Sequence, residues 1–133
     1  MSLLIDQLAA YLQTQGQGTV GTTIFKAKRP PSPVACVTIY ATGGYPPDRY
    51  NSREHPTLQI VARAATPQAS LQKAYAVYAL LHNKQHLNLG SGIFALTIQA
   101  IQSPASIGEE TAANATAHLA SLNILCDLRR PSS

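Results

Sequence analysis

The sequence predicts an α+β fold, in which two helices cover one face of a mostly antiparallel mixed sheet of four to five strands. Two observations support this prediction. Apolar and polar residues alternate over residues 57–64 and 118–128, which is typical of strands with unlike faces. Apolar residues recur every three or four positions over residues 2–14 and 66–82, which is the spacing of an amphipathic helix.

The length of 133 residues suits one compact domain over residues 1–133. Hydrophobic residues make up 45% and charged residues only 12%, so we expect a neutral surface that favours self-association. Cys36 and Cys126 occupy apolar positions of predicted strands and are expected to be buried free thiols. Because no signal-peptide pattern or membrane-length apolar run is found, we expect a soluble protein that is made inside the cell.

The first helix is predicted over residues 2–14, with Ser2 as its N-cap. Its apolar stripe would consist of Leu4, Leu8, Tyr11 and Leu12. A short edge strand is expected over residues 22–25. Three prolines in residues 26–33 remove backbone donors and fix φ, so we expect a basic and mobile loop there.

Residues 34–41 are β-branched and aromatic with two apolar faces, which favours an interior strand. Residues 42–56 are rich in Gly, Pro, Asn, Asp and Ser, and we expect a long, mobile loop with a functional role. The side chains in this loop that are of types enriched at protein interfaces are Tyr45, Arg49, Tyr50 and Arg53.

Residues 57–64 are predicted to form a strand that leads directly into a helix over residues 66–82. Thr66 is a suitable N-cap, and Pro67 suits the first helical position because proline lacks the N–H that would be unpaired there. The apolar stripe of this helix would consist of Leu71, Ala74, Tyr75, Val77, Tyr78, Leu80 and Leu81. We expect both tyrosines to belong to the core, with their hydroxyls at its rim.

Two further strands are predicted over residues 93–101 and 118–128. The first would turn Phe94, Leu96, Ile98 and Ala100 toward the core, and the second Ala120, Leu122, Ile124, Cys126 and Leu128. Residues 83–92 and 103–111 are expected to be turn-rich connections, and residues 129–133 a frayed tail. Of the four long strands, the first two and the last two are each expected to pair antiparallel.

No arrangement of residues predicts catalysis, so we expect no enzyme activity, cofactor or metal site. The glycine-flanked Ser91 lacks the strand–turn–helix context of a nucleophile. Glu109 and Glu110 are more typical of a solvated patch than of an acid/base pair. His82 and His86 would share one face only of a longer helix, and they lack the glutamate of a metalloprotease motif.

The formal net charge of +4 is distributed unevenly. Basic residues gather between positions 26 and 63, at Lys26, Lys28, Arg29, Arg49, Arg53 and Arg63. This distribution would suit contact with a phosphate backbone. No RRM, OB or helix-turn-helix signature predicts sequence-specific recognition of nucleic acid.

Several segments occur in a characteristic order along most of the chain: LLIDQLAAYL, TGGYPPDR, PTLQIVARA, ALLH, IFALTIQAIQSP, SIGEE and LNILCDLRR. In order and spacing they resemble the tail terminator group of small minor capsid, or tail-completion, proteins of tailed bacteriophages. Related sequences often carry a basic residue soon after the acidic turn, whereas residues 111–117 are neutral here.

The resemblance implies a structural protein with an α/β fold that forms a hexameric ring. Such a ring caps the tail tube, stops its polymerisation and joins the tail to the head connector, and DNA passes through its channel. The implied partners are other copies of the chain, the tail-tube protein, the head connector or completion protein and, transiently and non-specifically, DNA, with no membrane. The implied location is the tail–head junction of the virion, after synthesis in the bacterial host cytoplasm.

In that setting, the expected residues of the ring or tail-tube interface are Tyr45, Arg49, Tyr50, Arg53, Glu109 and Glu110. The expected basic residues facing the channel are Lys26, Lys28 and Arg29. Three alternatives remain: a head-completion adaptor, a DNA-associated binding module that uses the basic loops, and a small hydrolase or metal enzyme that uses His82 and His86. Strong salt-dependent binding of duplex DNA by the monomer would favour the binding module, and stoichiometric zinc would favour the enzyme.

Overall fold

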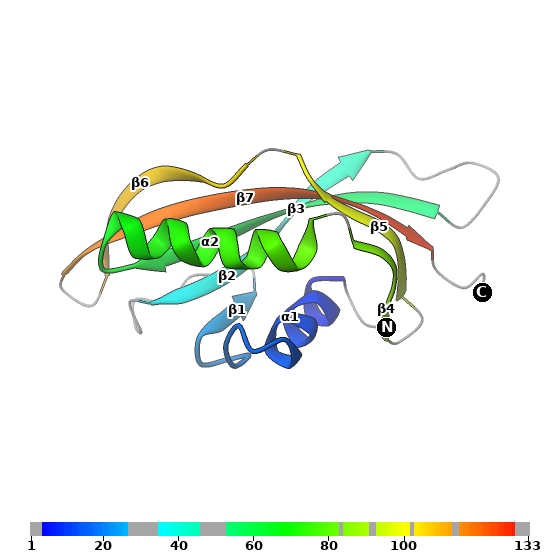
Figure 1. The fold of residues 1–133 in the computed structure, drawn as a ribbon, viewed down its shortest axis with the longest axis horizontal. Helices are drawn as coiled ribbons and strands as arrows, with labels where there is room; N and C mark the ends of the chain where they lie inside the picture. Colours follow the sequence, from blue (N-terminus) through cyan, green and yellow to red (C-terminus); the bar gives the residue numbers. More distant parts are fainter. Residues whose placement is uncertain are drawn as a thin grey trace.

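A computed structural model describes residues 4–26, 35–45, 53–82, 84–90, 93–101, 103–112 and 115–129 (Figure 1). These residues form α1 (Leu4–Thr14), β1 (Ile24–Lys26), β2 (Cys36–Tyr45), β3 (Arg53–Ala64), α2 (Pro67–Leu81), β4 (Lys84–Gly90), β5 (Ile93–Ala100), β6 (Ala105–Ala112) and β7 (Ala115–Arg129). The strand order is β1-β2-β3-β7-β5-β4, and β6 also pairs with β7. The predicted α+β class is therefore confirmed.

The long strand β7 is the centre of the sheet. It pairs antiparallel with β3 along one side, and with both β5 and β6 along the other. The pairing of β2 with β3 is also antiparallel, so both predicted antiparallel pairs are confirmed. Among the described strands, β1 differs because it runs parallel to β2.

The sheet has seven strands rather than the four or five predicted, because two expected connections are strands. Residues 84–90 form β4 against β5, and residues 105–112 form β6 against β7. Their sequences are rich in residues with low strand propensity, including glycine and glutamate. Pairing with a neighbour determines strand formation here more than propensity does, because cross-strand contacts supply most of the stabilisation.

The segment expected as an irregular loop over residues 42–56 is also shorter than predicted. β2 continues to Tyr45 and β3 begins at Arg53, with a bulge between Ala41 and Gly44. The remaining part, residues 46–52, lies outside the described residues, as do residues 27–33 of the basic loop predicted over residues 26–33. Arg129, expected in the frayed tail, instead pairs with β3 and β5 as the last residue of β7.

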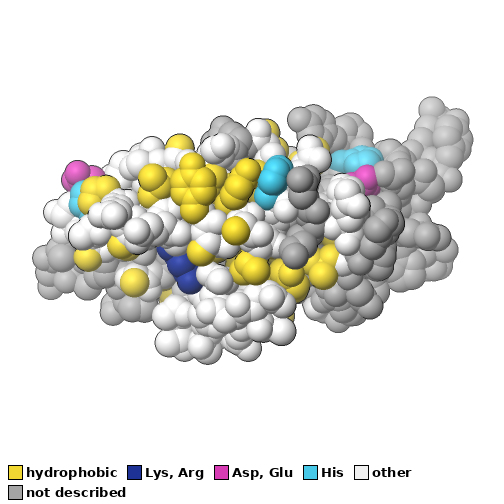
Figure 2. Space-filling model, viewed as in Figure 1, with side chains coloured by type: hydrophobic (Ala, Val, Ile, Leu, Met, Phe, Trp, Pro, Cys, Tyr) yellow, Lys and Arg dark blue, Asp and Glu magenta, His cyan; other side chains and the backbone are white. Residues whose placement is uncertain are grey.

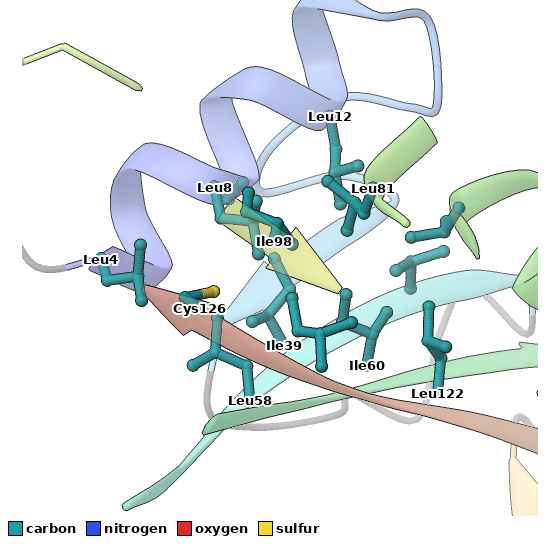
Figure 3. Packing of buried hydrophobic residues seen from close by; sticks show 14 of the residues in the cluster. Leu4, Leu8, Leu12, Ile39, Leu58, Ile60, Leu81, Ile98, Leu122 and Cys126 are labelled. Atoms are coloured by element: carbon teal, nitrogen blue, oxygen red, sulfur yellow. The ribbon is translucent and has the colours of Figure 1, made fainter. Parts of the chain in front are cut away.

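Both helices pack on the same face of the sheet, as predicted, and enclose one main core. Figure 3 shows leucines of α1 pointing toward side chains of β2, β3, β5 and β7, with Leu81 of α2 beside them. The largest fully buried members of the protein core are Leu8, Leu12, Ile24, Ile39, Leu58, Ile60, Leu81, Ile98, Leu122, Ile124 and Leu128. The predicted alternation of β3 and β7 is confirmed, because the even-numbered apolar residues of both strands lie in the helix-covered clusters.

The alternation predicted for β5 fails at its centre. The register against β7 shifts between Ala95 and Thr97, and Ala95 is fully buried in the core together with Ile98. A bulge adds one residue to one strand and so reverses which side chains face inward. Ile98 and Ala100 face the core as predicted, whereas the side chains of Phe94 and Leu96 are not among those described.

The N-terminus of α2 is as predicted, and so is its buried stripe except at Tyr75. Thr66 accepts a hydrogen bond from the Ala69 N–H at 3.1 Å, which confirms the N-cap. The fully buried residues of the helix are Ser70, Ala74, Val77 and Leu81. Tyr75 is 45% exposed, so its assignment to the core is wrong. Ala74 packs on Ala62 and Ala120, so the helix lies close to the sheet there, whereas Tyr78 packs half-buried against the main core.

The core packing predicts a large effect of Ile60→Ala. Ile60 is 1% exposed and lies in the main cluster, so its truncation should lower the free energy of unfolding by about 2–5 kcal/mol. Urea unfolding followed by circular dichroism would measure this. Gln72→Ala, at an exposed position of α2, is the control and should change the free energy by less than about 0.5 kcal/mol. Equal stability of both variants would contradict the packing described.

The two cysteines are buried and free, as predicted, and should be unreactive in the native protein. Cys126 lies in the helix-covered core, and burial raises its pKa to about 12. At pH 8 only roughly one such thiol in ten thousand is a reactive thiolate. We expect Ellman's reagent to label neither cysteine until urea is added, when both should react. Stoichiometric labelling of the folded protein would contradict this prediction.

Candidate interaction surfaces

The interface residues predicted from the sequence do not come together in one site. Arg53 pairs with Arg129 at one end of the sheet, whereas Glu109 pairs with His118 near the other. Measured along β7, positions 118 and 129 are separated by roughly 35 Å at about 3.3 Å per residue. The basic and acidic groups of the prediction therefore belong to two different surfaces.

The first surface is the arm formed by the paired ends of β2 and β3. In Figure 1 this arm extends past the C-terminal end of α2, on the side where β7 also ends. Its strands stay paired to Tyr45 and His55, and the hydroxyls of Thr42 and Thr57 lie 2.8 Å apart at its base. Arg53 begins the returning strand of the arm. Arg49 and Tyr50 fall in the segment outside the described residues.

His55 and Asp127 lie across from each other where the arm joins the sheet. The His55 Nδ1 is 3.7 Å from the Asp127 Oδ1, and both side chains are largely buried. Pro56 comes directly after this histidine and sits opposite Gly44. Proline lacks a donor for the ladder, so it is suited to this place next to the bulge. The arm is therefore held by side-chain contacts where its backbone pairing is interrupted.

Lys26, predicted to face a channel, lies at the end of the edge strand β1. Its Nζ donates a hydrogen bond to the Asp6 Oδ1 of α1 at 2.8 Å, and its side chain is 36% exposed. An exposed pair of this kind contributes at most about 1 kcal/mol. The contact partly neutralises Lys26 and attaches α1 to the sheet edge. Lys28 and Arg29 follow it in the sequence, outside the described residues.

Glu110 has a structural contact that the sequence did not indicate. Its Oε1 accepts a hydrogen bond from the Arg63 Nη1 at 2.8 Å. The Arg63 side chain is only 2% exposed, whereas that of Glu110 is 27% exposed. A guanidinium removed from water requires a charged partner, because unpaired buried charge is strongly unfavourable. This contact links β6 to β3 across β7.

An aromatic row on the outside of α2 was missed by the sequence analysis. The rings of Tyr75 and Tyr78 meet edge to face with centroids 5.9 Å apart, and Tyr78 stacks on His82 at 4.9 Å. The His82 Nδ1 accepts a hydrogen bond from the Ala100 N–H at 3.1 Å, which attaches the row to β5. The sequence feature that could have predicted this row is the low charge of the helix, in which Lys73 is the one ionisable residue besides the tyrosines.

Lys73 borders a cavity of about 330 Å³ between α2 and the turn that follows α1. Its Nζ donates to the backbone oxygen of Gln17 at 2.8 Å and to the Gln17 Oε1 at 3.0 Å. Burial lowers the pKa of the Lys73 amine below its usual range. Cys36 and Arg63 also line this cavity, and both are almost fully buried. The bonds of Lys73 hold the turn against the helix.

The histidine pair considered as a metal site is divided between two elements. His82 caps the C-terminus of α2, whereas His86 lies in β4. Within the described ranges, no group of three or more His, Cys, Asp or Glu residues is arranged to hold a metal ion. His118 Nδ1 lies 3.9 Å from the Glu109 Oε1, at the edge where β6 meets β7.

Comparison with known protein families identifies the family of this chain. A family model described as "Bacteriophage tail terminator protein" matches residues 11–129 of the 133-residue chain. The chain belongs to this tail terminator family. The predicted resemblance is confirmed, and the protein is a structural component of the phage virion. No curated protein matches the chain significantly.

The matched range includes every described strand, α2 and the last turn of α1, residues 11–14. The arm, the aromatic row and the Arg63–Glu110 contact therefore all lie within the tail terminator region. No helix in the described ranges is long and apolar enough to cross a membrane.

The Arg63–Glu110 contact predicts a measurable coupling between β3 and β6. Glu110→Gln should lower the free energy of unfolding by about 1–3 kcal/mol, because it leaves a buried guanidinium with a weaker partner. Arg63→Met should also destabilise, and the double variant should lose less than the sum of both. Urea unfolding of the four proteins gives the coupling energy.

Glu109→Gln is the matched control for this cycle. The Glu109 side chain is 62% exposed, so its neutralisation should change stability by less than about 0.5 kcal/mol. Strictly additive effects of the Arg63 and Glu110 substitutions would show that the contact does not stabilise the fold.

Proposed function

We propose that the protein forms a ring that caps the phage tail tube, stops its polymerisation and joins the tail to the head connector. The observation that carries this proposal is the match of residues 11–129 to the tail terminator family. A single chain of 133 residues has little surface to share among a tail tube, a head connector and its own copies. Assembly into a ring, with six copies as the expected number, multiplies these contacts around the tube by symmetry.

The arm is the proposed contact with the tail tube. It projects past the helices, and its tip carries Tyr45 and Arg53 on either side of the segment with Arg49 and Tyr50 (Figure 1). Tyrosine and arginine are enriched at protein interfaces because they bury large surfaces and donate several hydrogen bonds. Pairing with β7 gives the base of the arm a fixed direction.

The basic residues Lys26, Lys28 and Arg29 are the proposed lining of the channel for DNA. The ion pair with Asp6 partly neutralises Lys26, so its attraction for a phosphate group is weaker. Each cation that neutralises a phosphate adds to affinity, so a strongly basic lining would hold DNA instead of letting it pass. A mildly basic lining fits the proposed transit of DNA between head and tail.

The test uses tails from a phage strain that lacks this protein. Without it, we expect tubes longer than in mature virions and heads that do not attach. Addition of the purified protein during assembly should restore a uniform tube length with a ring at the end, measured by electron microscopy. Restored head attachment on tubes that were already uniform would instead indicate the head-completion role.

The arm is tested in the same assay with Arg49→Gln/Arg53→Gln. We expect this variant to fold normally, because surface loop changes cost little stability, but to cap at least tenfold fewer tubes at equal concentration. The control is Ala10→Glu/Gln15→Glu, which lowers the net charge equally at exposed positions of α1 and of the turn after it. Normal capping by the arginine variant would exclude the arm as the tube contact.

A further inference from the structure

The cavity beside Lys73 is large enough for a ligand and opens to solvent. It has a volume of about 330 Å³ and lies where the first half of α2 faces the turn after α1. Its described walls include the buried Val37 and Ala64, and the exposed Ala35 and Ala69 lie at its mouth. Figure 2 shows basic side-chain atoms recessed between the hydrophobic side chains of α2 and this turn. A cavity of about 150 Å³ can hold a benzene molecule, so this one has room for a ring and several further atoms.

Lys73 brings a positive charge to the cavity. Its side chain is half-buried, and burial lowers the pKa of its amine. The two oxygens that accept its hydrogen bonds, the backbone oxygen and the Oε1 of Gln17, are neutral. Within the described part of the chain, no carboxylate forms an ion pair with Lys73. Neutral acceptors replace only part of the hydration that a half-buried cation loses, so a carboxylate at this place would stabilise it.

The walls of the cavity divide into hydrogen-bond donors and apolar surface. An ammonium group has three N–H donors, and Gln17 accepts from two of those of Lys73. The side-chain amide of Gln17 accepts through its oxygen, so its N–H groups are further donors on the same wall. The other lining side chains are mainly small and apolar, as at Val37, Ala64 and Ala69. These offer contacts to a hydrocarbon group.

We propose that this cavity is a binding site for a carboxylate attached to a small apolar group. The carboxylate accepts hydrogen bonds from Lys73 and Gln17, and the apolar group packs against Val37 and Ala64. Two sources supply this chemistry. One is a small organic acid, and the other is an aspartate or glutamate next to an apolar residue of another protein.

Other classes of ligand fit the cavity less well. A neutral apolar molecule would remove water from Lys73 without replacing its hydrogen bonds, which is unfavourable. A phosphate carries up to two charges and has more acceptor oxygens than the donors of this wall can satisfy. A cation would be repelled by Lys73 itself.

Phenylacetate, which joins a carboxylate to a benzene ring, is the probe for a direct test. Titration into the ¹⁵N-labelled protein should shift the amide signals of Val37, Ala64 and Ala69 saturably, with a Kd of about 1 mM for so small a ligand. 2-Phenylethanol, which has a hydroxyl in place of the carboxylate, and inorganic phosphate should each bind about tenfold more weakly. The inference is overturned by equal affinity for 2-phenylethanol, or by the lack of saturable shifts up to about 20 mM phenylacetate.

Substitutions of Lys73 separate ligand binding from support of the turn. Lys73→Met keeps an unbranched side chain but removes the charge, so phenylacetate and 2-phenylethanol should then bind about equally. A loosened turn would weaken both ligands alike and leave the ratio of their Kd values unchanged. Lys73→Arg keeps the charge and should keep the preference for phenylacetate. A preference that persists in Lys73→Met would contradict the assignment.

Filling the mouth of the cavity tests its location. Ala69→Leu adds a larger side chain at the mouth and should raise the Kd for phenylacetate by about tenfold or more. Ala79→Leu is the matched control, because Ala79 is exposed on the same helix and does not line the cavity. Equal weakening or equal binding by the two variants would place the ligand elsewhere.

The titration of the Lys73 amine is an independent measurement. The ligand pairs with the charged amine, so saturating phenylacetate should raise the pKa that burial lowers in the free protein. The affinity for phenylacetate should accordingly fall as the pH rises through the pKa of the amine. The other titratable groups described at the cavity are Cys36, which is buried, and Arg63, which is paired with Glu110. NMR of the Lys73 side-chain carbons follows this amine alone, and an unchanged pKa in the complex would contradict the proposed contact.

Reductive methylation of Lys73, followed by mass spectrometry, distinguishes the two sources of the carboxylate. Protection of Lys73 on assembled tails but not in the isolated protein would assign the carboxylate to a neighbouring protein. Equal methylation on and off tails, with protection by phenylacetate, would assign it to a small organic acid. Methylation that phenylacetate does not reduce in the isolated protein would overturn the inference. None of these readouts depends on termination of the tail tube, so this inference and the proposed function can fail separately.

Discussion

Strand β7 organises the fold, because it pairs with β3 along one side and with β5 and β6 along the other. Its even-numbered residues lie in the helix-covered core, and its two ends fix the arm and the β6 edge at opposite ends of the sheet. β5 and β6 are strands because β7 supplies their partner, and β5 in turn supplies the partner of β4. One long, alternating segment thereby determines where each candidate surface lies.

Close packing of α2 connects this core to the surface. Alanines on the helix and on both central strands bring the helix near the sheet around Ala74. Tyr75 lies on the outside and contacts Tyr78, which packs half-buried against the core and stacks on His82. The same choice of residues that stabilises the helix on the sheet therefore produces a rigid aromatic row on the outside.

Charged residues are few in this chain, and several of them pair across elements of the fold. Arg63 and Glu110 join β6 to the sheet, Lys26 and Asp6 join α1 to β1, and His55 and Asp127 meet at the base of the arm. These contacts connect elements that are distant in sequence. The neutral surface that remains suits a tail terminator protein, which acts by assembling with other proteins.

Periodicity, capping chemistry and the order of motifs were enough to predict the fold class, both helices, the N-cap at Thr66, the four long strands and the family. The strands β4 and β6 could not be predicted in this way, because their own propensities are weak and a neighbouring strand supplies their hydrogen bonds in the folded protein. The tertiary structure also decided that Tyr75 is exposed whereas Tyr78 packs against the core, because both fit the same helical spacing. The distance between Arg53 and Glu109 likewise depends on strand register, which no local pattern encodes.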